Sequence, residues 1–129
     1  MRKILGFRPG NPELYARAFL HSSFANNTRE HYKNHNERLE FLGDLILDAA
    51  VGTFLYEKYP HLDEGELTRR KMKFVNRATL NKLAYRMNLQ DMIIGNFSYQ
   101  KMPEDVAGNC LEALIGAVYL DKGFEFTCK

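Results

Sequence analysis

Apolar residues recur at intervals of three and four positions along most of the chain, which is the period of a helix with one buried face. The longest such stretch covers residues 37–59 and stops before Pro60. No stretch alternates between apolar and polar residues as a half-buried strand would. The pattern therefore predicts an all-α fold. The stripe expected to face the core on the long helix consists of Leu39, Leu42, Ile46, Ala49 and Ala50.

Two shorter helices are predicted from signals at their first residues. Asn11 is followed by a proline and an acid, which is typical of a helix start, and this helix is expected to run to about residue 22. Asp63 and Glu66 have the spacing of a capping box, so a second helix is expected to start there and run to about residue 75.

Two further helices are predicted in the second half of the chain. Asn76 can cap one, and residues 103–105 can open the other, which Gly123 is expected to end. Residues 93–102 show no clear period and predict a loop or a short helix. The residues expected to face inward are Leu80, Leu83, Ala84 and Met87 in the first of these helices, and Leu111, Leu114, Ile115 and Val118 in the second.

Composition indicates an ordinary globular chain. The 129 residues, 45% of them hydrophobic, predict a single domain over residues 1–129. Cys110 and Cys128 have neither disulfide nor metal-ligand spacing, which fits a reducing compartment. The N-terminus lacks the apolar core of a signal peptide, and no run approaches the roughly 18 apolar residues of a membrane helix. We therefore expect a soluble, cytoplasmic protein with no membrane partner.

The net charge of +2 is uninformative, but its distribution is not. Acids gather in residues 37–48 and bases in residues 69–86. An acidic patch beside a basic one suits a nuclease, because bases hold phosphates and acids hold metal ions. Two solvated helix faces would give the same pattern. The acids are Glu37, Glu40, Asp44 and Asp48; the bases are Arg69, Arg70, Lys71, Lys73, Arg77, Lys82 and Arg86.

The four acids of the long helix share one face. Their spacing of three, four and four places them within an arc of roughly 80°, with Glu40 and Asp44 about 6 Å apart along the axis. Stacked like charges destabilise a helix unless a cation offsets them, and magnesium prefers carboxylate oxygens. Asn109 and Glu112 form a second pair on one face of the last helix. If the two helices cross, Glu40, Asp44, Asn109 and Glu112 could surround one cation; plain surface charge is the alternative.

The run from His35 to Asp44, HNERLEFLGD, resembles the signature of the ribonuclease III family almost without interruption. Residues 18–24, residues 63–80 and residues 111–121 also resemble segments of the family and occur in its order. Together these stretches cover most of the chain. The resemblance implies the helical fold of the ribonuclease III endonuclease domain.

The resemblance also implies roles for individual residues. Glu40, Asp44 and Glu112 match metal-binding carboxylates, with Asn109 at the fourth metal position, and Asp44 and Glu112 are the expected catalytic residues. The implied cofactor is Mg²⁺, for which Mn²⁺ could substitute, with no organic cofactor. Phe41 matches an aromatic plug that enters a socket on the partner subunit. The expected substrate-binding residues are Glu37, Glu64 and Lys71.

The implied activity is endonucleolytic cleavage of double-stranded RNA by a homodimer in RNA processing, with ribosomal RNA among the candidate substrates. Each subunit is expected to cut one strand, leaving 5′-phosphate products with short 3′ overhangs. Duplex RNA is recognised mainly by shape and backbone, so weak sequence preference and strong salt dependence are expected.

Three features depart from the family pattern. Asn109 replaces the usual aspartate. It fits a native residue tolerated in an active or weakly active enzyme, an engineered change that inactivates the enzyme, or a non-catalytic dimeric module that binds double-stranded RNA. Lys71 and Met72 replace arginine and alanine, and lysine lacks the bidentate fork of arginine. The chain ends at Lys129 without the double-stranded-RNA-binding domain that bacterial members carry, as in a piece of a longer protein or a minimal enzyme. A helical metal-binding module with no role on RNA is a third, weaker reading.

Overall fold

The computed structural model describes residues 6–21, 35–95, 103 and 105–127. Within these residues the fold is all-α, as predicted, and the only β contact is an isolated parallel bridge between Leu20 and Ile94. The helices are α2 (Pro12–Ala18), α5 (Glu37–Lys58), α6 (Glu64–Phe74), α7 (Arg77–Arg86), the 3-10 helix η1 (Leu89–Asp91), α8 (Val106–Lys122) and α9 (Phe124–Thr127).

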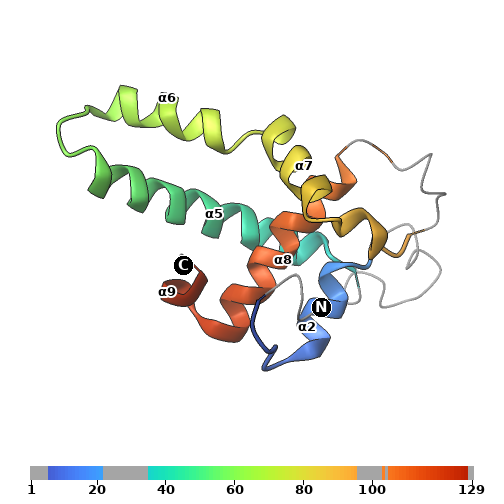
Figure 1. Cartoon of the computed structure of the whole chain (residues 1–129). Helices are drawn as coiled ribbons and strands as arrows, with labels where there is room; N and C mark the ends of the chain where they lie inside the picture. The colour runs from blue at the N-terminus through green and yellow to red at the C-terminus, as the bar shows by residue number, and fades with distance from the viewer. Residues whose placement is uncertain (1–5, 22–34, 96–102, 104, 128–129) are drawn as a thin grey trace.

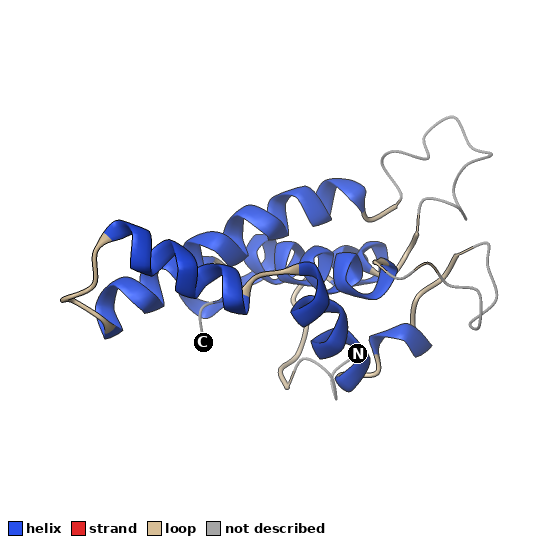
Figure 2. Cartoon of the chain, turned by 90° about the horizontal axis from the view of Figure 1, so that it is seen from above, coloured by secondary structure: helices blue, strands red, loops and turns tan. Residues whose placement is uncertain are grey.

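Helix α8 lies at the centre of the domain and packs against α2, α5 and α7 (Figure 1). Most of its circumference is apolar, so other helices can pack around it. Helices α5 and α6 form a hairpin that extends away from this centre, as both views show (Figures 1 and 2). In the part of the chain that the structure describes, no helix is long and apolar enough to cross a membrane. The buried residues of α8 are Val106, Ala107, Gly108, Cys110, Leu111, Ala113, Leu114, Gly116 and Ala117.

Helices α5 and α8 cross at a pair of glycines. A Cβ added at Gly43 would overlap the carbonyl oxygen of Glu112, and one added at Gly116 would lie 2.5 Å from the carbonyl oxygen of Leu39. Each helix therefore presents bare backbone to the other, and no larger residue fits at either position without moving a helix. This close approach fixes which faces of α5 and α8 meet.

The predicted helix starts of α6 and α7 are confirmed. Asp63 accepts a hydrogen bond from the backbone N–H of Glu66 at 2.8 Å, and Asn76 accepts one from that of Thr79 at 2.9 Å. Both caps satisfy N–H groups that have no partner within the helix. The predicted end of α8 at Gly123, which has a positive φ of 88°, is also confirmed.

Helix α2 ends at Ala18, so the predicted extension to about residue 22 is wrong. The chain leaves the helix because Leu20 forms the bridge with Ile94, and the N–H of Ile94 donates to the carbonyl of Phe19 at 2.8 Å. The carbonyl of Ala18 accepts the side-chain amide of Asn36 at 3.1 Å. Helix α8 begins at Val106, directly after Asp105, the last of the residues predicted to open it.

The predicted apolar stripe of α5 is partly wrong. Leu39 is buried, but Leu42 and Ile46 are half-buried and Ala49 is exposed. The contact with α8 is centred on Leu39 and Gly43, so the buried face is rotated toward the acidic positions. On α7, Leu80 and Ala84 are buried as predicted, whereas Leu83 is 45% exposed at the edge of the interface. Cys110 is buried and free; residues 96–102 and Cys128 lie outside the described residues.

Candidate active site

A polar pocket of about 700 Å³ opens where α5 and α8 meet the start of α7. It brings together Glu40 and Asp44 from α5 with Asn109 and Glu112 from α8, the four residues predicted as metal ligands. Glu37 also lines this pocket, whereas Glu64 and Lys71 do not. The remaining lining residues are Phe41, Val75, Asn76, Arg77 and Leu80.

The glycine crossing explains why these side chains meet. Glu40 and Asp44 lie three residues before and one after Gly43, on the flank of the contact face of α5. Glu112 lies on α8 at the point where its carbonyl oxygen abuts Gly43, and Asn109 lies one turn before it. Because the backbones touch, short and medium side chains beside the crossing open into the same space.

The carboxylates of Asp44 and Glu112 are crowded. Partial burial, a hydrogen bond with Asp44 and the negative charges of Asp44, Glu40 and Asp48 raise the pKa of Glu112 to about 8. The raised pKa of Glu112 reflects the unfavourable crowding of carboxyl groups at this point of the pocket, and a bound cation would relieve it.

The pKa of Glu40 is also raised by burial and by neighbouring acids, though less than that of Glu112. Its partial burial and the neighbouring charges of Glu37 and Asp44 raise its pKa, and the guanidinium of Arg77 opposes that shift. Arg77 belongs to the start of α7 and is the single basic residue among the described residues that line the pocket. Sequence reasoning counted Arg77 only as one of a cluster of bases, since nothing in the periodicity links α7 to the acids.

The donor set suits a hard divalent cation in its chemistry. Carboxylate and amide oxygens are magnesium ligands, and magnesium needs only one or two carboxylates because it keeps several waters. In the described residues, however, no three His, Cys, Asp or Glu side chains converge closely enough to hold a metal ion. Asp44 and Glu112 are close enough to share a hydrogen bond, so a cation held here would use this pair first and complete its shell with water.

The start of α5 is held by two residues of the predicted motif whose role sequence reasoning missed. His35 and Asn36 are each only 3% exposed. Asn36 joins α5 to the first part of the chain, since its backbone N–H donates to Leu20 at 2.9 Å and its side chain to Ala18. The Nδ1 atom of His35 accepts the backbone N–H of Glu37 at 3.2 Å. These residues fix where α5 begins and therefore where Glu37 and Glu40 point.

The other two predicted substrate-binding residues lie on α6. Glu64 is exposed in the first turn of that helix. Lys71 faces α5, where its Nζ atom lies 3.6 Å from a carboxylate oxygen of Asp48. Lys71 thus pairs with the outermost acid of the predicted stripe. The substrate-binding roles of Glu64 and Lys71 stay predictions.

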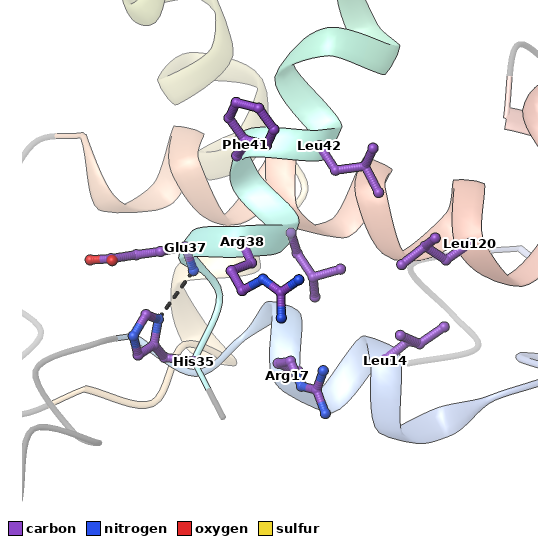
Figure 3. A pocket seen from close by; sticks show the side chains of 9 residues that line it. Leu14, Arg17, His35, Glu37, Arg38, Phe41, Leu42 and Leu120 are labelled. Atoms are coloured by element: carbon purple, nitrogen blue, oxygen red, sulfur yellow. Dashed lines mark hydrogen bonds between the residues drawn. The ribbon is translucent and has the colours of Figure 1, made fainter. Parts of the chain in front are cut away.

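A second cavity, of about 580 Å³, adjoins Phe41 on the side of α5 that faces α2 and the end of α8 (Figure 3). Phe41 is 70% exposed and is one of several large apolar residues at the surface of the described part of the chain. One wall of the cavity is apolar and the other carries charged or polar groups. The lining residues are Leu14, Arg17, His35, Glu37, Arg38, Leu39, Phe41, Leu42 and Leu120.

The sequence is similar to known ribonucleases over nearly its whole length. A family profile described as ribonuclease-III-like matches residues 11–129. Proteins named ribonuclease 3 from Bacteroides thetaiotaomicron and Azobacteroides pseudotrichonymphae are 45% and 43% identical to it. The alignments cover 98% and 95% of this chain but 40% and 46% of those proteins, so the chain spans less than half of their length.

Solved structures agree with the sequence comparison. The nuclease domain of ribonuclease III from Campylobacter jejuni, in a structure reported for flexibility in the region involved in dimer formation, aligns with a TM-score of 0.87 and 34% identity. That alignment covers 98% of this chain and 87% of the other. Dicer from Pichia stipitis aligns with a TM-score of 0.66 and 28% identity, over 91% of this chain and 49% of that one. By its sequence and its fold, the chain belongs to the ribonuclease-III-like family.

Proposed function

We propose that this domain is a magnesium-dependent endoribonuclease that cleaves double-stranded RNA, in the cytoplasm, during RNA processing. The observation that carries the proposal is the pocket that brings Glu40 and Asp44 of α5 together with Asn109 and Glu112 of α8. Family membership supports the same reaction, because the similar proteins are named ribonuclease 3.

Each residue of the pocket has a distinct proposed role. Asp44 and Glu112 bind the metal ion and are the catalytic pair; Glu40 and Asn109 complete the ligand set. When bound, Mg²⁺ supplies positive charge that stabilises the attacked phosphate and the leaving oxygen. Before it binds, Glu112 must release its proton, so metal affinity should rise with pH. Glu37, which lines the pocket, is proposed to contact the substrate there, and Glu64 and Lys71 are proposed to contact it from α6.

The proposed active form is a homodimer in which Phe41 of each protomer enters the cavity beside Phe41 of the other. In a two-fold interface the same patch serves both subunits, and here the exposed ring and the apolar wall are neighbours (Figure 3). Dimer formation by the similar Campylobacter jejuni domain supports this assembly. Each protomer then cuts one strand, giving 5′-phosphate products with short 3′ overhangs.

Phe41→Asp is expected to shift the protein from dimer to monomer, because a carboxylate cannot be buried in the apolar cavity without a large desolvation cost. Sedimentation velocity measures the change. Phe54→Asp is the matched control, since Phe54 is also an exposed aromatic residue of α5 but lies on nearly the opposite side of the helix from Phe41. A dimer that survives Phe41→Asp would refute the plug assignment.

The alternative is a non-catalytic dimer that binds duplex RNA, and the feature that favours it is Asn109. This side chain lines the pocket half-buried but contributes no charge to a cation site. The alternative predicts RNA binding with no cleavage under any metal. We favour the enzyme, because Asp44 and Glu112 alone satisfy the few protein ligands that magnesium requires.

Asn109→Asp is expected to raise magnesium affinity and cleavage of a long RNA duplex by at least about tenfold, in the range that changes around a metal site produce. The added carboxylate increases attraction for the cation. Cleavage is followed on gels across a magnesium titration, with EDTA as the blank in which no product forms. Asn109→Ala, which removes the amide oxygen, is expected to lower cleavage. If Asn109→Asp stays inert even in excess manganese, the non-catalytic alternative holds.

A further inference from the structure

Arg77 occupies a position that the proposed ligand set does not use. It is the first residue of α7, its side chain is 81% exposed, and it lines the acidic pocket together with Glu40 and Asp44. The positive charge of Arg77 acts on Glu40: it lowers the pKa of that carboxyl, whereas burial raises it. A long exposed arginine beside several acids would ordinarily fold onto them.

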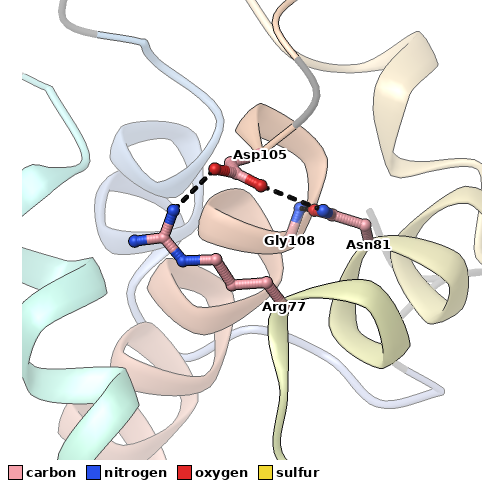
Figure 4. A network of polar contacts seen from close by, with 4 residues as sticks. All are labelled: Arg77, Asn81, Asp105 and Gly108. Carbon is pink, nitrogen blue, oxygen red and sulfur yellow. Dashed lines mark hydrogen bonds and ion pairs between the residues drawn. The ribbon is translucent and has the colours of Figure 1, made fainter.

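In the structure the guanidinium instead donates to a hydrogen-bond network at the start of α8. The Nη1 atom of Arg77 donates to a carboxylate oxygen of Asp105 at 2.7 Å, and the other oxygen of Asp105 accepts the side-chain amide of Asn81 at 3.3 Å (Figure 4). The side-chain oxygen of Asn81 in turn accepts the backbone N–H of Gly108 at 2.8 Å. This network, here called the tether, joins α7 to the start of α8, the helix that also carries Glu112.

The tether has two chemical consequences. It keeps the guanidinium at the pocket rim, so that Arg77 does not occupy the carboxylates that a metal ion needs. It also engages one edge of a planar group that has five N–H donors, which leaves donors for a second anion. The anion that must approach this pocket is the phosphate of the RNA backbone, and the pocket acids Glu37, Glu40, Asp44 and Glu112 would repel it.

We propose that Arg77 binds an RNA backbone phosphate at the rim of the acidic pocket, and that Asp105 is a positioning residue that holds Arg77 away from the metal-binding carboxylates. This inference rests on the proposed function, because it assumes RNA as the substrate. Arg77 offsets the repulsion between phosphate and acids, and Asp105 keeps that charge from competing with the cation.

The first test measures binding of a short RNA duplex by fluorescence anisotropy at several salt concentrations, in the Glu112→Gln background so that no cleavage occurs. Arg77→Gln is expected to weaken binding on the order of tenfold and to lower the slope of log Kd against log salt by about 1 per protomer. Arg77→Lys should keep most of the slope. Arg86→Ala is the control, because Arg86 is an exposed arginine in the last turn of the same helix.

The second test measures the magnesium requirement of cleavage in the otherwise unchanged protein. Asp105→Asn should raise the magnesium concentration for half-maximal cleavage several-fold, since the released Arg77 competes for the carboxylates. Adding Arg77→Gln to Asp105→Asn should reverse that increase, which a purely structural role of Asp105 would not produce. Thermal unfolding of each variant verifies that it is folded.

The outcomes separate the two proposals. If the parent protein binds and cleaves duplex RNA but Arg77→Gln retains the salt slope and affinity of Arg86→Ala, the phosphate role is wrong and the proposed function stands. If the magnesium requirement is unchanged in Asp105→Asn, or not reversed in the double variant, the positioning role is wrong. If the parent protein neither binds nor cleaves duplex RNA, the proposed function itself fails.

Discussion

Glu112→Gln is expected to abolish magnesium-dependent cleavage while making the metal-free domain more stable at and above neutral pH. Loss of the carboxylate removes half of the proposed catalytic pair, and we expect cleavage to fall by at least about 10²–10³-fold, the cost of removing one group that stabilises a transition state. Glutamine keeps the size of the side chain and can still donate to Asp44 without a charge.

The gain in stability follows from the direction of the pKa shift. The pKa of Glu112 is higher in the fold than in the unfolded chain, so its contribution is most favourable at low pH and is lost as pH rises from the ordinary carboxyl range through about 8. The variant should therefore unfold at a higher temperature than the parent at pH 8 in EDTA, by a few degrees, and the difference should vanish near pH 4. Added magnesium should stabilise the parent alone.

Glu57→Gln is the control for both measurements, because Glu57 is an exposed acid of the same helix α5 as Asp44, away from the pocket. It should leave cleavage and its pH dependence unchanged. Cleavage by Glu112→Gln at the parent's rate would contradict the catalytic assignment. Equal stability of parent and variant across the pH series would contradict the crowding of Asp44 and Glu112.

Gly43→Ala is expected to lower the free energy of unfolding by about 1–3 kcal/mol or more, the cost of overpacking a well-packed contact. The added methyl group overlaps the carbonyl oxygen of Glu112, which is backbone and cannot rotate away, so α5 and α8 must separate. Urea unfolding measures the loss. Cleavage should fall further than stability alone explains, because the same separation moves Asp44 from Glu112.

Gly52→Ala provides a control within the same helix. A Cβ at Gly52 meets nothing within 4 Å, so this change should stabilise the domain by about 0.4–1 kcal/mol through reduced freedom of the unfolded chain. If Gly43→Ala stabilised the domain as Gly52→Ala does, the close approach of α5 and α8 at Gly43 would be contradicted. The decisive result is that the free energy of unfolding falls with alanine at position 43 and rises with alanine at position 52 of the same helix.

Helix ends were predictable because their signals are local. The caps at Asp63 and Asn76 depend on hydrogen bonds to residues three positions away, so the sequence contains both partners. The early end of α2 was not predictable in this way. It depends on Ile94 and Asn36, which are distant in sequence and reach α2 only in the folded chain.

The pocket was predictable only in part. Spacing placed Glu40 with Asp44, and Asn109 with Glu112, on shared helix faces, but periodicity does not reveal which helices cross. The crossing depends on Gly43 and Gly116, and a glycine has no side chain to contribute to a hydrophobic pattern. Arg77 was missed for a related reason, since its tether to Asp105 joins two segments that are far apart in sequence.

Helix α6 has an energetic consequence for the domain. It contains no buried residue. It contacts α5 through a half-buried ion pair between Lys71 and Asp48, and the guanidinium of Arg70 lies 4.3 Å from the ring centre of Tyr59. Such contacts contribute little free energy each, whereas α8 is surrounded by apolar side chains. Amide protons of α6 should therefore exchange with solvent through a local opening that leaves α8 protected, so that α6 and the core around α8 behave as separate cooperative units.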